Sequence, residues 1–228
     1  MVSQRSRDRR PSRDRILDAA AVEFAARGFD GAKVDRIAAR AGVNKAMLYY
    51  HFRNKADLYR AVLRDVFQAI ASAVAGSRTP GGTPADQLRG YIRALAAESA
   101  SRPHLPSLWL REMAEGGRHL DASVIGHLTA VLGVLAGITR GGRDAGAFGD
   151  VHPFVLQLGI VAPLLMFTAS APLRERFARD FPPAMASVTR DDLVRHVETS
   201  ALAALASAKS TRGDVRRPAR ARKRSGRE

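Results

Sequence analysis

Two short helical patterns separated by a glycine lie within residues 33–55, KVDRIAARAGVNKAMLYYHFRNK. Ile37 lies in the first apolar pattern, Gly42 follows it, and Leu48 and Phe52 are the predicted core positions of the second. Two helices joined by such a tight turn form a helix-turn-helix, whose second helix can enter the major groove of DNA. The segment therefore predicts a small DNA-binding unit.

The start of the second helix carries side chains suited to reading DNA. Asn44 stands at the N-cap position, before a helix N-terminus whose partial positive charge favours phosphate. Lys45 can reach a guanine edge or a phosphate, while Ala46 and Met47 can contact a thymine methyl. We therefore expect base contacts from this end of the helix.

Aromatic and cationic side chains continue along the same helix and just beyond it. Tyr49, Tyr50 and His51 carry hydroxyl or ring N–H donors suited to phosphate oxygens. Lys55 begins the next helix and adds its own charge to that helix's dipole. The alternative for Tyr49 and His51 is packing against the unit's own core.

The segment NKAMLYYHFRNKADLY closely resembles the recognition-helix signature of the TetR family of bacterial transcription regulators. That signature has a small polar residue and Lys, then Leu-Tyr, two aromatic or histidine residues, Phe, and a Lys a few residues later. The preceding RILDAAAVEFAARGFDGAKVDRIAARAGV also fits the family's first two helices and turn. The resemblance covers about residues 12–64 and implies a dimeric, ligand-responsive DNA-binding protein.

The chain departs from the family pattern at two places. Ala32-Lys33 stands where the family usually has Thr or Ser, so Lys33 substitutes for a hydroxyl contact to phosphate. Ala46-Met47 stands where Gly and Thr often follow the first Lys, which indicates an unusual base preference. The predicted DNA-binding residues are Lys33, Asn44, Lys45, Ala46, Met47, Tyr49, Tyr50, His51 and Lys55.

The rest of the chain predicts an all-α fold, because period-two alternation with strand-forming residues does not persist anywhere. Ser12 is the expected N-cap of a first helix that ends at Arg27, with Gly28 as its C-cap. Asn54 is the expected N-cap of a long fourth helix. The predicted helices cover residues 12–27, 34–41, 45–51, 55–75, 85–101, 105–115, 120–145, 151–170, 173–179 and 190–209.

Composition excludes several classes of protein. The chain has 228 residues, 46% of them hydrophobic, which is enough for a substantial core. It has no cysteine, so disulfides, thiolate zinc sites and cysteine nucleophiles are excluded, and its six histidines lack metal-ligand spacing. We find no nucleophile–base pair, paired carboxylates or phosphate-binding glycine loop. We therefore expect no enzyme activity, cofactor or metal.

The formal net charge is +15, and most of the excess lies in the two ends of the chain. We expect residues 1–11 to be a basic disordered arm and residues 211–228 a basic disordered tail. The arm leads directly into the first helix and can contact DNA, and the tail can bind any polyanion. A solvated tail is the alternative for both. Between them, residues 12–55 form the predicted DNA-binding domain and 56–210 the ligand-binding and dimerisation domain.

The regulatory half is expected to hold a cavity for a small, largely apolar or aromatic effector, because such sites are walled mainly by apolar groups with a few polar ones. Arg111 and Glu112 are further polar candidates beside Trp109, or else a surface pair. Ordinary core packing is the alternative for the aromatic and methionine side chains. The predicted ligand-binding residues are Trp109, Met113, His127, Phe154, Gln157, Leu158 and Met166.

One helix-turn-helix gives too few contacts for a specific site, so we expect a homodimer on a palindromic double-stranded DNA operator. The dimer is predicted to form through about residues 151–170 and 190–209, where Val197, Ala201 and Leu205 share one apolar side. The alternative is that these segments are core of a single subunit. A repressor is the commoner role in the family; a transcriptional activator or a sequence-nonspecific DNA-binding protein is the alternative.

Two segments without Asp, Glu, Lys or Arg, 122–139 and 153–173, are long enough to raise a membrane hairpin as an alternative. A helix buried on nearly all sides inside a dimer has the same composition, and we expect that reading. The charged N-terminus has no apolar run of a secretory signal. The sequence therefore predicts a cytoplasmic protein with no membrane partner.

Overall fold

A computed structural model of the chain describes residues 11–180 and 187–215, with side chains placed up to residue 208. These residues form helices joined by turns and loops, without a strand in the described ranges, which confirms the all-α prediction. Residues 1–10 of the predicted arm (1–11) and residues 216–228 of the predicted tail (211–228) lie outside the described residues. The helices are α2 (Ser12–Gly31), α3 (Val34–Ala41), α4 (Lys45–His51), α5 (Lys55–Gly76), α6 (Pro84–Ser101), α7 (Leu105–Ala114), α8 (Ala122–Asp144), α9 (Pro153–Ala169), α10 (Ala171–Arg176) and α12 (Arg190–Val215).

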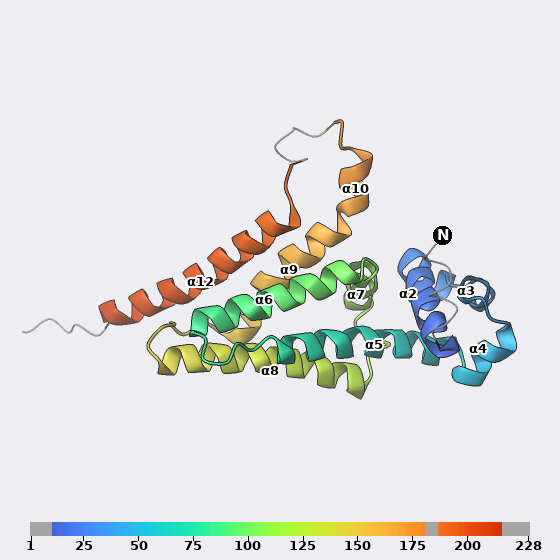
Figure 1. The fold of residues 1–228 in the computed structure, drawn as a ribbon, viewed down its shortest axis with the longest axis horizontal. Coiled ribbons are helices and arrows are strands. Elements are labelled where there is room, and N and C mark those ends of the chain that lie inside the picture. Colours follow the sequence, from blue (N-terminus) through green and yellow to red (C-terminus); the bar gives the residue numbers. More distant parts are fainter. Residues whose placement is uncertain (1–10, 181–186, 216–228) are drawn as a thin grey trace, which may run out of the picture.

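Helices α2, α3 and α4 form a small unit at one end of the molecule (Figure 1). Its core is fully buried and includes Phe24, Ile37 and Leu48, as the apolar spacing predicts. Gly42 ends α3 with a φ of 64°, a left-handed conformation that glycine adopts without a steric penalty. The backbone N–H of Gly42 bonds to carbonyls at the end of α3. This turn sets the angle between the two helices of the motif.

Two of the three predicted N-caps are confirmed. The Oδ1 atom of Asn44 accepts from the backbone N–H of Met47 at 2.7 Å, and Oδ1 of Asn54 accepts from Asp57 N–H at 2.8 Å. The prediction for Ser12 is wrong, because Pro11 occupies the N-cap position of α2 without a side-chain cap bond. The Ser12 hydroxyl instead bonds to a distant helix, which the local sequence does not reveal.

The first helix breaks at Gly28, as predicted, and one further turn follows it. Gly28 has a φ of 70° and interrupts the helical geometry, but the chain then makes another turn and α2 ends at Gly31. Phe29 lies in that added turn, where its ring stacks on Phe24 with centroids 6.3 Å apart. Phe29 therefore packs against the core from the turn that follows the kink at Gly28.

The regulatory half is a bundle that begins with α5, which leaves the DNA-binding unit and runs beside α8 and α6 (Figure 1). Helix α8 packs along α5 and also contacts α6 and α9, while α12 packs on α6 and α9. The backbone N–H of Gly149, after α8, donates to the Leu205 carbonyl in α12 at 2.8 Å. Helix α12 continues to Val215, whereas the sequence analysis ended it at 209.

Helix α8 is long and apolar enough to cross a membrane by length and composition, and 22% of its most apolar window is buried within the chain. The expectation of burial on nearly all sides is therefore not met by one copy. Helix α9 is the shorter apolar helix. Its packing on α6, α8 and α12 also leaves part of its surface uncovered.

Adjacent glycines near the end of α8 provide a matched test of this packing. A Cβ atom on Gly142 would lie 2.0 Å from the Phe148 ring, whereas one on Gly141 would meet no atom within 4 Å. We expect Gly142→Ala to lower the free energy of unfolding by roughly 1–3 kcal/mol through overpacking. Gly141→Ala should raise it by about 0.5–1 kcal/mol, because alanine loses less backbone entropy in a helix. Urea denaturation followed by circular dichroism measures both, and equal effects would contradict the placement of Phe148.

Candidate DNA-binding surface and effector cavity

Helix α4 presents most of its predicted DNA-binding side chains to solvent. Leu48 and Phe52 are buried and hold the helix on α2 and α3, as predicted for core positions. Tyr50 is 82% exposed, and Tyr49 and Met47 are 44% and 40% exposed. Large side chains exposed to water along one short helix are unusual for a purely structural helix and suit contact with a DNA groove.

The cation at the start of α4 is held by the neighbouring helix. The Nζ atom of Lys45 lies 2.9 Å from Oδ1 of Asp35 in α3, with both side chains exposed. The hydrogen bond and charge of Asp35 raise the pKa of Lys45 above its ordinary value. Lys45 therefore stays charged, and its exposed ion pair is weak enough to exchange for a DNA contact. Lys33 and Ala46 are also exposed nearby.

Two other predicted contacts are tied to α2. The Nε2 atom of His51 and the Ser12 hydroxyl are 2.7 Å apart, and the His51 side chain is partly buried. The ammonium of Lys55 donates to the Asp30 carbonyl at 3.1 Å and lies 4.8 Å from the centre of the Phe29 ring. These partners of Lys55 are neutral, so they position its charge without cancelling it. Asn44 is likewise engaged in capping α4.

A cavity of about 380 Å³ lies among α5, α6, α7, α8 and α9. Its wall is mostly apolar, and its polar side chains are Ser99, Thr129 and Gln157. Five predicted ligand-binding residues line it, namely Trp109, Met113, Phe154, Gln157 and Leu158. Trp109 also packs edge-on against Phe67, with ring centroids 5.0 Å apart.

Two predicted ligand-binding residues lie outside this wall. His127 precedes Leu128, which lines the cavity, and consecutive residues point about 100° apart around a helix. Met166 follows Leu165 in the wall by the same rotation and is 57% exposed on the outer side of α9. Both helices are apolar on several sides, so their sequence pattern did not identify which side faces the cavity.

One polar group of the wall is oriented by a buried tyrosine. The Tyr91 hydroxyl donates to Oε1 of Gln157 at 2.6 Å and also lies 3.3 Å from the Val131 carbonyl. Burial raises the pKa of Tyr91, so the phenol stays protonated and remains a donor. The Gln157 amide nitrogen is then the group that can donate to a ligand.

Glu112 does not line the cavity but is buried where the regulatory half meets the DNA-binding unit. Its Oε1 lies 2.8 Å from Nδ1 of His119, and its Oε2 accepts from the backbone N–H of His119 at 3.3 Å. The His119 ring lies 4.3 Å from the Phe29 ring of α2 and 4.9 Å from the Tyr59 ring of α5. Burial, and then the Glu112 carboxylate, raise the pKa of Tyr59. We call Glu112, His119 and Tyr59 the joint cluster.

The joint cluster was missed by sequence reasoning because the Gly116-Gly117 turn folds His119 back onto Glu112. Both glycines have positive φ, and α7 ends at Ala114, so the two partners do not lie on one continuous helix. Arg111 also lies in this region: its guanidinium nitrogen is 3.2 Å from the position of a Cβ on Gly28. Helix α7 therefore contacts α2 with one side while Trp109 and Met113 line the cavity with another.

The same region holds a group of side chains with metal-ligand chemistry. Donor atoms of Glu112, Glu115 and His119 lie within 4.8 Å of one another, a set that sequence spacing did not indicate. The Nε atom of Arg118 lies 2.8 Å from the Glu115 carboxylate. A cation nearby disfavours a metal ion, so we interpret the set as an ion-pair network.

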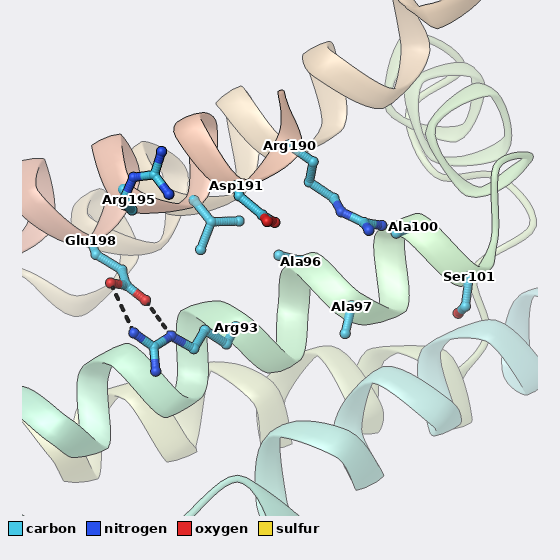
Figure 2. A pocket seen from close by; sticks show the side chains of 10 residues that line it. Arg93, Ala96, Ala97, Ala100, Ser101, Arg190, Asp191, Arg195 and Glu198 are labelled. Atoms are coloured by element: carbon cyan, nitrogen blue, oxygen red, sulfur yellow. Dashed lines mark hydrogen bonds and ion pairs between the residues drawn. The ribbon is translucent and has the colours of Figure 1, made fainter. Parts of the chain in front are cut away.

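A second, open groove of about 630 Å³ lies between α6 and α12 (Figure 2). Ala96, Ala97 and Ala100 line it on α6, and charged side chains from both helices surround it. The Nε atom of Arg93 bonds to Oε1 of Glu198 at 2.7 Å across the groove. This mixed-charge surface contrasts with the apolar cavity, which is the better site for an apolar molecule.

Comparisons with known proteins agree with this architecture. A sequence model described as bacterial regulatory proteins of the tetR family matches residues 16–62. The transcriptional regulator RutR of Escherichia coli K12 is 30% identical over 171 residues, which span 75% of this chain and 80% of RutR. The transcriptional repressor SCO4008 of Streptomyces coelicolor is 35% identical over 112 residues, 49% of this chain and 55% of that protein.

Solved structures show the same fold. A bacterial regulatory protein of the tetR family from Rhodococcus RHA1 has a TM-score of 0.67 and 22% identity, covering 86% of this chain and 97% of that one. The FadR regulator of Bacillus subtilis, solved in complex with stearoyl-CoA, has a TM-score of 0.63 and 20% identity, covering 86% and 98%.

Proposed function

The chain belongs to the TetR family of bacterial regulatory proteins, and on that premise we propose that it is a repressor that releases its operator when an apolar effector binds. It is a DNA-binding transcription regulator rather than an enzyme. The observation that carries the proposal is that one helix, α7, lines the apolar cavity and also contacts α2 of the DNA-binding unit. The relatives SCO4008 and NicS of Pseudomonas putida are named repressors, which favours repression.

The DNA contacts follow from the exposed side of α4. We assign Lys45, Ala46 and Met47 to base edges, because they lie in the first turn of the helix. We assign phosphate contacts to the side chains around these three residues. Phosphate contacts position the helix on DNA but do not read its sequence. The side chains assigned to phosphates are Lys33, Tyr49, Tyr50 and Lys55. His51 bonds to Ser12, so we assign it the role of holding α4 on α2.

A specific operator requires two copies of this surface. One α4 helix offers few base contacts, whereas a two-fold dimer reads two half-sites of a near-palindrome. We place the dimer contact on α9 and α12. We place the protein in the cytoplasm, where bacterial DNA lies.

The side of α12 that we expected to form the seam lies within its own chain. Val197, Ala201 and Leu205 are buried, at 2%, 5% and 0% exposure, because α12 packs on α6 and α9. For these residues the alternative of intrasubunit core is correct. The faces left for a partner are the opposite side of α12, around Ala203, and the outer side of α9, around Ala162.

The effector is an uncharged, largely apolar molecule that fits about 380 Å³. The residues of the wall carry no charged side chain, so a charged ligand would lose hydration without an ionic partner. Gln157 can bind a single polar group and fix its orientation. The FadR relative, solved with stearoyl-CoA, shows an acyl ligand on this fold, and an acyl or aromatic group suits the cavity here.

A repressor is expected to bind its operator much more tightly than random DNA. DNA from around the gene should bind roughly 10³-fold or more tightly than random DNA at physiological salt. Uncharged aromatic and aliphatic compounds can be screened by the emission of Trp109, the only tryptophan, and each hit tested for operator release. Similar affinity for operator and random DNA would instead establish the nonspecific DNA-binding alternative. A hit that strengthens operator binding would favour activation.

A further inference from the structure

We propose that the effector cavity is incomplete in one copy and that the outer side of α9 from a second copy closes its mouth. The inference rests on the proposed dimer and specifies what the partner contributes. It concerns the apolar surface made by Met113, Phe154 and Leu158 together with the neighbouring face of α9.

The mouth of the cavity is formed by wall residues that remain half in water. Met113, Phe154 and Leu158 line the cavity and are 50%, 51% and 53% exposed. Ile125 of α8 is 48% exposed close to Leu128 and Thr129 of the wall. An apolar ligand bound here would keep part of its surface in water, which weakens hydrophobic binding.

The mouth continues directly onto the outer side of α9. Val155 and Gly159 follow Phe154 and Leu158 in sequence, so each lies about 100° further around the same helix. Val155 is 60% exposed, and Gly159, Ala162 and Met166 are exposed on the same side. The uncovered apolar surface thus extends unbroken from the cavity to the outer face of the helix.

A helix that is apolar around its whole circumference is normally buried on all sides. Residues 153–173 contain no Asp, Glu, Lys or Arg, yet within one chain the buried residues of α9 are Leu156, Ile160, Leu164 and Leu165. The remaining surface therefore needs a partner with an apolar face of its own.

The outer face of α9 is suited to pack against the same face of a second copy of this chain. Gly159 and Ala162 are small and lie between the larger Val155 and Met166, so another helix can approach its backbone closely. A two-fold axis places the same face of each copy against the other, and no charge on this face opposes that pairing. The same contact brings partner atoms to Phe154 and Leu158, which adjoin it.

This arrangement links effector binding to assembly. A ligand that binds the closed cavity of the dimer more tightly than the open cavity of one copy stabilises the dimer, and dimer formation raises ligand affinity by the same factor. Effector affinity should therefore fall when the protein is diluted into its monomeric range.

The first test splits the dimer without touching the cavity wall. Met166→Glu and Gly159→Arg each place charge in the outer face of α9; Val22→Glu, at an exposed site on α2, is the control. Sedimentation gives the assembly, circular dichroism the fold, and N-phenyl-1-naphthylamine, an uncharged apolar dye, the cavity affinity. We expect folded monomers with at least tenfold weaker dye binding, and a control like the parent. Folded monomers that bind dye as tightly as the parent would overturn the inference.

A second test needs no ligand, because the chain has no cysteine. The thiol of Leu158→Cys should react with N-ethylmaleimide at least tenfold more slowly in the dimer than when combined with Met166→Glu. Val22→Cys should react at one rate in both backgrounds. If Leu158→Cys reacts at the same rate with and without Met166→Glu, the partner does not close the cavity. That result would still be compatible with a dimeric repressor. If the unaltered chain sediments as a monomer, the proposed dimer fails and closure fails with it.

Discussion

Lys45→Ala is expected to lower the affinity of the dimer for its operator by roughly 30- to 10⁴-fold, because a good base contact discriminates by about 5- to 150-fold and both half-sites lose it. Lys45 lies in the first turn of α4, where the helix N-terminus approaches the groove. It makes no buried contact, so the fold should be unaffected. Fluorescence anisotropy with operator and random DNA, and a melting curve, measure the two effects.

The ion pair with Asp35 supplies the control for this prediction. Both side chains are exposed, so the pair contributes little to stability and must break for Lys45 to reach DNA. Asp35→Ala should therefore leave operator affinity unchanged or raise it slightly. If Asp35→Ala weakens binding as much as Lys45→Ala, the pair orients α3 and α4, and Lys45 is not a DNA contact. Selection on randomised DNA should also show a relaxed preference at one position per half-site in Lys45→Ala.

The DNA-binding unit was predictable because its structure depends on local signals. The Gly42 turn, the caps at Asn44 and Asn54 and the buried Leu48 are all within a few residues of the features that specify them. Ser12 failed as an N-cap because its hydroxyl bonds to His51, 39 residues away. Local propensity cannot report such a tertiary partner.

The sequence predicted the apolar character of the cavity but did not identify all of its wall residues correctly. A period of 3.6 residues identifies the buried side of a helix only when another side is polar. Helix α9 has apolar residues all round, so Leu158 in the wall and Met166 on the outer face look alike in sequence. The joint cluster was not predictable, because Glu112 and His119 are brought together by the turn after α7 and not by the periodicity of one helix.

Glu112→Ala is expected to uncouple effector from DNA and to destabilise the chain. The buried His119 ring and the Tyr59 hydroxyl would lose their carboxylate partner, which costs roughly 1–3 kcal/mol of unfolding free energy. This corresponds to a fall in melting temperature of about 2–12 °C for a chain of this size. Because α7 would no longer be fixed to α2 and α5 at this point, an effector found with Trp109 should lose most of its influence on operator affinity, about 5- to 150-fold in such systems.

Two further variants separate coupling from stability. Glu112→Gln keeps the size and an acceptor oxygen for His119, so the melting temperature should recover partly and coupling should recover with it. Glu115→Ala removes an exposed carboxylate that pairs with Arg118 at 2.8 Å, and both quantities should stay within error of the parent. Operator titrations with and without effector measure the coupling. If Glu112→Ala lowers the melting temperature but the effector still releases DNA fully, the joint cluster is only structural and the signal passes through α5 alone.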